Sequence, residues 1–109
     1  MKTECDLKNL EAALTSGAPV VDVRETDEYC QVRIPGVTSI PLSEFVTRVH
    51  EIPEAETVYV VCGVGGRSSQ AARYLEAQGI HAVSVCGGTT AWIQSGRPVE
   101  TGATSTAMA

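Results

Sequence analysis

The sequence has no long apolar run and no concentration of positive charge. No segment approaches the roughly 20 consecutive apolar residues of a membrane-spanning helix, and the first residues, Met1 to Asp6, contain no apolar signal core. We therefore expect no membrane partner and a cytoplasmic location. The net charge is −5 and the Lys and Arg residues are scattered, whereas nucleic-acid binding calls for a basic patch. We expect no nucleic-acid partner, but a small anion bound in one local pocket is compatible with this charge.

The sequence also lacks the residue spacings of a metal site or a disulfide framework. Its two histidines, His50 and His81, have no ligand spacing to the cysteines, and both are most simply read as surface residues. The four cysteines are separated by 25, 32 and 24 residues, which matches neither a zinc pair nor a small disulfide-rich domain. We predict reduced thiols, no metal and no cofactor. The cysteines are Cys5, Cys30, Cys62 and Cys86.

What the chain does contain is a regular alternation of helical and extended segments. Its 109 residues are enough for one domain, which we assign to residues 1–100. The segment 101–109 is small, uncharged and without periodicity, so we expect a disordered C-terminal tail. Short apolar strands, each followed by a helix, predict an α/β fold with a parallel sheet covered on both faces.

The boundaries follow from the apolar spacing and from the residues that begin and end each segment. Strands are predicted over 20–23, 38–40, 57–62 and 82–86. Helices are predicted from Leu7 to a stop at Gly17, from Thr26 to Tyr29, over 44–52 with Ser43 as the cap, over 68–78, and around Ala91, Trp92 and Ile93.

The most informative segment is the turn that follows the strand ending at Cys62. Cys62 precedes a glycine-rich stretch and then a helix, so its sulfur is expected among the unpaired N–H groups of the helix N-terminus. Such a helix end stabilises an anion by roughly 0.3–2 kcal/mol, enough to lower a thiol pKa from about 8.5 to about 7. The glycines let the backbone curl into a cradle, and Arg67 closes it with a fixed positive charge. A tight turn around an inert cysteine is the alternative reading.

Several patterns together resemble those of the single-domain rhodaneses, the thiosulfate sulfurtransferases. They cover about residues 5–100 in the order expected of that family. One departure lies before Ile34-Pro35-Gly36, where Gly-His is common in the family and Val32-Arg33 stands here. The patterns are Val20-Val21-Asp22-Val23-Arg24-Glu25, Ile34-Pro35-Gly36, Cys62-x-x-Gly65-x-Arg67-Ser68 and Gly87-Gly88-x-x-Ala91-Trp92-x-x-x-Gly96-x-Pro98-Val99.

The resemblance implies a five-stranded parallel sheet flanked by helices on both faces, with Cys62 as the catalytic residue. Cys62 would take the sulfane sulfur of thiosulfate or a related small anionic donor, hold it as a persulfide, and pass it to a cyanide or thiol acceptor, possible acceptors including protein thiols. The residues expected to bind the donor are Gly63, Val64, Gly65, Gly66, Arg67 and Ser68.

Two other functions stay open at this point. Certain phosphatases and arsenate reductases also use a cysteine loop that ends in arginine, but five residues separate the two there and four separate Cys62 from Arg67 here. A protein-to-protein sulfur relay would use the same chemistry on Cys62, with little turnover of free thiosulfate. The sequence does not distinguish a relay from an enzyme acting on free donors.

The remaining candidate residues have secondary roles. Cys86 ends a strand at the same sheet edge as Cys62, so it could resolve the persulfide or form a disulfide under oxidation, or simply fill an apolar slot. Asp22 and Arg24 are expected to pair, Trp92 to lie in the core, Arg33 to add positive potential near the pocket, and Cys5 and Cys30 to be bystanders.

Overall fold

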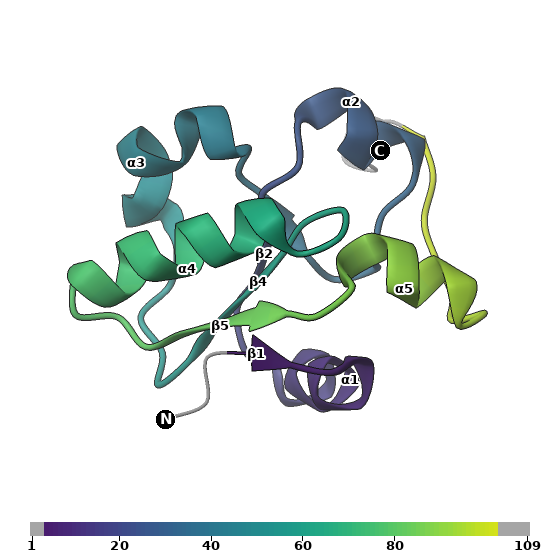
Figure 1. Ribbon diagram of the computed structural model, residues 1–109, viewed down its shortest axis with the longest axis horizontal. Helices are drawn as coiled ribbons and strands as arrows, with labels where there is room; N and C mark the ends of the chain where they lie inside the picture. Colours follow the sequence, from purple (N-terminus) through teal and green to yellow (C-terminus); the bar gives the residue numbers. More distant parts are fainter. Residues whose placement is uncertain (1–3, 103–109) are drawn as a thin grey trace.

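A computed structural model of the chain describes residues 4–102 and contains a five-stranded parallel sheet (Figure 1). The strand order is β1-β5-β4-β2-β3, and every neighbouring pair is parallel. The predicted α/β fold is thereby confirmed. The strands are β1 (Glu4–Cys5), β2 (Val20–Asp22), β3 (Thr38–Ser39), β4 (Val58–Val61) and β5 (Ala82–Val85).

Helices cover both faces of the sheet, as predicted. Each face has its own apolar cluster, because successive residues of a strand point to opposite sides. Phe45 and Leu75 pack on the face that carries Val60, and Leu10, Tyr29 and Trp92 pack on the opposite face. The helical segments are α1 (Leu7–Ser16), α2 (Thr26–Gln31), η1 (Leu42–Glu44), α3 (Phe45–Arg48), η2 (Val49–Glu51), α4 (Gly66–Ala77) and α5 (Gly88–Gln94).

The caps of α1 agree with the local sequence. The side chain of Asp6 accepts a hydrogen bond of 2.9 Å from the Asn9 N–H, and Gly17 ends the helix with a φ of 83°. Trp92 is buried as predicted, and its indole N–H donates to the Pro98 carbonyl at 2.7 Å.

Other boundaries differ from the sequence-based ones. β1 is missing from the predicted strands, because only two residues form it and their pairing partner β5 lies about 80 positions away. The predicted helix 44–52 is divided into η1, α3 and η2, and Ser43 does not cap it. The Ser43 hydroxyl donates to the Glu25 carboxylate at 3.1 Å instead. His81 is half-buried, with its Nδ1 3.0 Å from the Thr57 hydroxyl, rather than a surface residue.

The segment after α5 crosses back over α2. Arg33 and Glu100 exchange two main-chain hydrogen bonds of 2.8 and 2.9 Å, and the Gly102 N–H donates to the Cys30 carbonyl at 2.6 Å. The Arg33 guanidinium is buried over the Tyr29 ring and pairs with Glu100, which offsets its positive charge. Residues 103–109 of the predicted tail lie outside the described part of the chain.

None of the helices described over residues 4–102 has the length and hydropathy needed to cross a membrane. Within the same residues, no three His, Cys, Asp or Glu side chains are grouped closely enough to hold a metal ion.

Candidate active site

The candidate site is the turn between β4 and α4. β4 is a run of four apolar residues ending at Val61, and the glycines that follow allow the chain to reverse into the helix at once. Gly65 is the N-cap of α4. Its φ of 132° is a backbone conformation that residues with a side chain rarely adopt. The helix begins at Gly66, two residues earlier than predicted. The turn therefore places Cys62 directly beneath the first turn of α4.

The Cys62 sulfur is enclosed by hydrogen-bonding groups of this turn. Only 1% of the residue is exposed. The Gly65 N–H donates to Sγ at 3.0 Å, and the Ser68 hydroxyl oxygen lies 3.5 Å from Sγ. The sulfur therefore accepts from an N–H of the turn, and in the thiol form it donates its hydrogen to a hydroxyl of the helix.

These groups lower the pKa of the Cys62 thiol from its ordinary value. Burial alone would raise this pKa, because the thiolate loses hydration. The Ser68 hydroxyl and the main-chain N–H groups of Ser68, Gly65 and Arg67 stabilise the thiolate and outweigh burial. The direction agrees with the sequence-based argument from the helix N-terminus.

The start of α5 holds the other side of the turn. The Thr89 N–H donates to the Cys62 carbonyl at 2.8 Å, and the Thr90 N–H donates to the Gly63 carbonyl at 3.0 Å. Figure 1 shows α5 beginning beside this turn. Gly88 makes the approach possible, because a Cβ at this position would collide with the Cys62 carbonyl oxygen. With its carbonyls turned toward α5, the loop is free to direct N–H groups at the sulfur.

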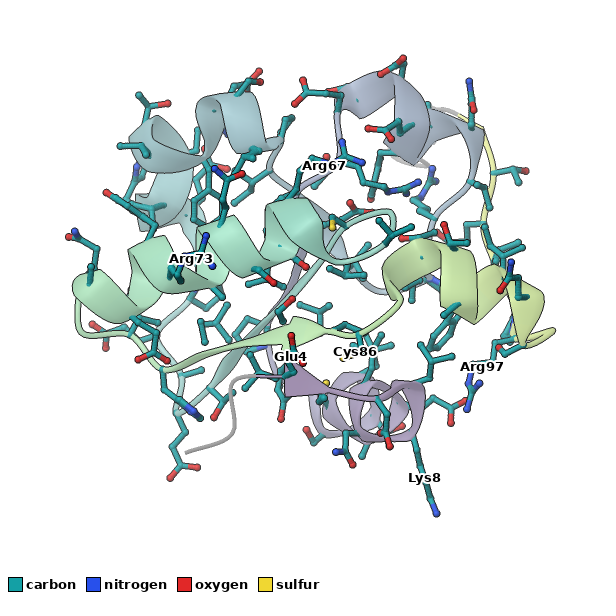
Figure 2. All side chains as sticks on the ribbon, in the orientation of Figure 1. Glu4, Lys8, Arg67, Arg73, Cys86 and Arg97 are labelled. Atoms are coloured by element: carbon teal, nitrogen blue, oxygen red, sulfur yellow. The ribbon has the colours of Figure 1, made fainter. Side chains whose placement is uncertain are left out.

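Arg67 lies at the N-terminal end of α4 (Figure 2) and is paired with a carboxylate from α2. Its guanidinium donates two hydrogen bonds to Glu28, of 2.7 and 3.1 Å, and its Nη2 lies against Gly63. The Arg67 hydrogen bonds are the main cause that lowers the pKa of Glu28 to about 2. The fixed positive charge expected at the end of the loop is therefore one half of an ion pair.

A second ion pair supports the end of β2. Asp22 and Arg24 form a buried pair with an N–O distance of 2.9 Å, as expected from their positions. Arg24 also donates to the Val32 carbonyl at 2.7 Å, just beyond α2. This link holds both ends of the segment that carries Glu28.

Cys86 directly follows the last residue of β5; it is exposed and lies next to Glu4 of β1 (Figure 2). Its Sγ is 3.4 Å from a Glu4 carboxylate oxygen, and this contact raises the pKa of the Cys86 thiol. A protonated thiol is a poor nucleophile toward a persulfide. The resolving role of Cys86 stays a prediction, which mild peroxide followed by mass spectrometry would test as a Cys62–Cys86 crosslink.

Comparison with known proteins shows the family to which the chain belongs. A family model, the rhodanese-like domain, matches residues 6–95. The chain belongs to the rhodanese-like domain family. It is 35% identical over 102 residues to a sulfurtransferase of Allochromatium vinosum, a match that covers 91% of this chain and 95% of that protein.

Two further similarities are to a Bacillus subtilis protein and to a solved structure. A Bacillus subtilis protein, YrkF, whose name contains the words sulfur carrier protein, is 44% identical over 64 residues; these cover 59% of this chain and 35% of that protein. The match thus takes in about a third of that relative's length. Among solved structures, a rhodanese-related protein of Thermoplasma volcanium superposes with a TM-score of 0.81 at 30% identity, covering 89% of this chain and 96% of that one.

Two features of this rhodanese-like site escape the sequence reading. Glu28 lies 39 residues from Arg67, and its only local signal is the capping contact with the Glu25 N–H at 3.0 Å. The sequence shows the Gly87-Gly88 pair only as a turn after a strand. Its contact with the Cys62 loop arises because β4 and β5 are neighbours in the sheet.

Proposed function

We propose that this rhodanese-like domain is a sulfurtransferase in which Cys62 carries the transferred sulfur. The observation that supports this is the set of polar groups around the sulfur: the Gly65 N–H, which donates to it at 3.0 Å, and the Ser68 hydroxyl, whose oxygen lies 3.5 Å away. They favour the thiolate, which is the nucleophilic form of cysteine. Because such a thiol must stay reduced, the proposed location is the cytoplasm.

The first half of the proposed reaction loads the cysteine. The Cys62 thiolate attacks the outer sulfur of thiosulfate and forms a new S–S bond. The S–S bond of thiosulfate breaks, and sulfite leaves with the bonding electron pair. No separate general base is needed, because the attacking sulfur is already deprotonated. The negative charge on the terminal sulfur is then stabilised by the loop N–H groups, in the way that an oxyanion hole stabilises oxygen.

The second half of the proposed reaction removes the transferred sulfur from Cys62. A thiolate or cyanide attacks the terminal sulfur of the persulfide, and the bond to Sγ breaks to return the Cys62 thiolate. Cys62 is buried in the loop, and the acceptor has to reach only the outer sulfur of the persulfide.

Intact mass after incubation with thiosulfate tests the proposal. We expect a gain of one sulfur atom, which cyanide or dithiothreitol removes, and no gain in Cys62→Ser. Cys30→Ser is the matched control, since Cys30 is half-buried on α2 and should leave the loading intact. Loading that persists in Cys62→Ser would contradict the assignment.

A protein-to-protein sulfur relay is the second candidate, and two observations favour it. Arg67 is already paired with Glu28, which weakens its attraction for a free anion. Val64, at the tip of the loop, is 72% exposed, which suits contact with another protein. Saturation by thiosulfate only at very high concentration, together with rapid transfer to a protein thiol, would favour the relay over an enzyme acting on free donors.

Phosphatase or arsenate reductase activity has less support. The loop has one residue fewer than the phosphatase pattern, and Arg67 is paired with Glu28 rather than directed at a tetrahedral anion. Hydrolysis of an aryl phosphate by the wild type that is lost in Cys62→Ser would reverse this ranking.

A further inference from the structure

Three serine hydroxyls, two of them buried and the third half-buried, form a chain behind the Cys62 sulfur. Ser68 is fully buried, and Ser84, on β5, is 3% exposed. Their hydroxyl oxygens are 2.7 Å apart, and that of Ser69 lies 3.5 Å from Ser84. The Ser68 oxygen is also 3.5 Å from the Cys62 sulfur. The chain thus runs from the sulfur across α4 to the neighbouring strand.

The direction of these hydrogen bonds depends on whether Cys62 is protonated. With a thiol, the S–H donates to the Ser68 oxygen, and the Ser68 O–H is free to donate to the Gly65 carbonyl at 3.1 Å. With a thiolate, the sulfur has no hydrogen to give, so the single Ser68 hydrogen must turn toward it. The Ser68 oxygen then has lone pairs without a donor, in a place closed to water.

Ser84 is the group that can supply that donor. Its hydroxyl is the closest polar group to the Ser68 oxygen, at 2.7 Å, and it can point its hydrogen there once Ser68 has turned. A hydroxyl that accepts one hydrogen bond becomes a better donor in the next. Ser84 therefore strengthens the bond from Ser68 to the thiolate without touching the sulfur.

The carbonyl that Ser68 leaves is still satisfied. Gly65 O also accepts the Ser69 hydroxyl at 2.9 Å and the Ser69 N–H at 3.1 Å. A buried acceptor left without a partner would oppose the rotation of the Ser68 hydroxyl. None is left here, because the Gly65 carbonyl keeps its two bonds from Ser69.

We propose that Ser84 is a positioning residue, which stabilises the Cys62 thiolate by donating to Ser68. The proposal deepens the proposed function, since the thiolate it stabilises is the form that would accept sulfur. It is tested on the thiol alone, so its outcome does not depend on whether sulfur is transferred.

The test is the pH dependence of Cys62 alkylation by iodoacetamide, followed by peptide mass spectrometry so that the other thiols do not interfere. In Ser84→Ala we expect the midpoint of the profile to move to higher pH. A neutral hydrogen bond of this kind corresponds to a change of about two- to tenfold in the thiolate equilibrium. Ser84→Thr, which keeps the hydroxyl, should retain the wild-type midpoint.

A double-mutant cycle separates this role from a general structural one. If Ser84 acts through Ser68, the variant with both Ser68→Ala and Ser84→Ala should have the same midpoint as Ser68→Ala alone. The proposal is overturned if Ser84→Ala leaves the midpoint unchanged, if Ser84→Thr shifts it as far as Ser84→Ala, or if the two single shifts add in full.

Discussion

Replacing Gly88 by alanine would press a methyl group against the backbone of the Cys62 loop. Gly88 is the first residue of α5, with a φ of 55°, and a Cβ there would collide with the Cys62 carbonyl oxygen and come within 2.8 Å of the Gly63 carbonyl oxygen. These are main-chain atoms, which cannot rotate away as a side chain could. Either α5 or the loop must move.

The cost has two parts. A left-handed backbone conformation costs an alanine roughly 1–2 kcal/mol, whatever surrounds it. Overpacking against atoms that cannot relax costs typically about 1–3 kcal/mol more. Gly79→Ala is the matched control for the first part, because Gly79 has a φ of 84° and nothing within 4 Å of its Cβ position. The difference between the two variants is therefore the cost of the collision alone, about 1–3 kcal/mol.

Urea unfolding measures this difference as a change in midpoint at constant m-value. In a domain of this size, each kcal/mol also lowers Tm by roughly 4–8 °C. We expect Gly88→Ala to lose more stability than Gly79→Ala, and its Cys62 to be alkylated more slowly at neutral pH, because the displaced loop no longer directs the Gly65 N–H at the sulfur.

Equal stability of the two alanine variants, with wild-type reactivity of Cys62 in both, would refute this reasoning. It would mean that α5 does not support the loop through Thr89 and Thr90, and that the close approach of Gly88 is not required.

Three further predictions concern the charged groups near the two thiols. Glu28→Gln should leave the positive charge of Arg67 without its partner and so lower KM for thiosulfate several-fold, while kcat changes little. An unchanged KM would show that the ion pair does not limit anion binding. The pKa of Glu28 is lowered to about 2 in the folded protein. The stability that its ionised form contributes is therefore fully present above its unfolded-state pKa of about 4.3, and it is lost as the pH falls toward the folded-state pKa. Because the pair is more than one third exposed, we expect it to contribute only about 1 kcal/mol to the free energy of unfolding. Urea midpoints of the wild type and Glu28→Gln near pH 5 and near pH 3 measure this contribution. An equal loss of stability in both proteins would contradict it. Glu4→Gln should lower the raised pKa of Cys86 and speed its alkylation at mildly alkaline pH, and no change in rate would show that Glu4 does not control this thiol.

Residues close in sequence account for what could be predicted. An apolar strand, a cysteine, a glycine-rich turn and an amphipathic helix are contiguous, so their order alone places Cys62 at the start of α4. The stop of α1 at Gly17 is local in the same sense, because the left-handed conformation is a property of the residue itself. The boundaries that differ, such as β1 and the divided helix after Pro41, depend on partners outside the local segment.

The α/β architecture and the placement of a cysteine at a helix N-terminus follow from the order of residues along the chain, because strand, turn and helix signals are carried by neighbouring residues. The surroundings of that cysteine depend instead on contacts between distant segments. Glu28 meets Arg67 across 39 residues, Ser84 meets Ser68 across 16, and the start of α5 closes on the Cys62 loop because β4 and β5 are adjacent. Such contacts arise from the packing of elements that are separate in the chain, and no local pattern encodes them.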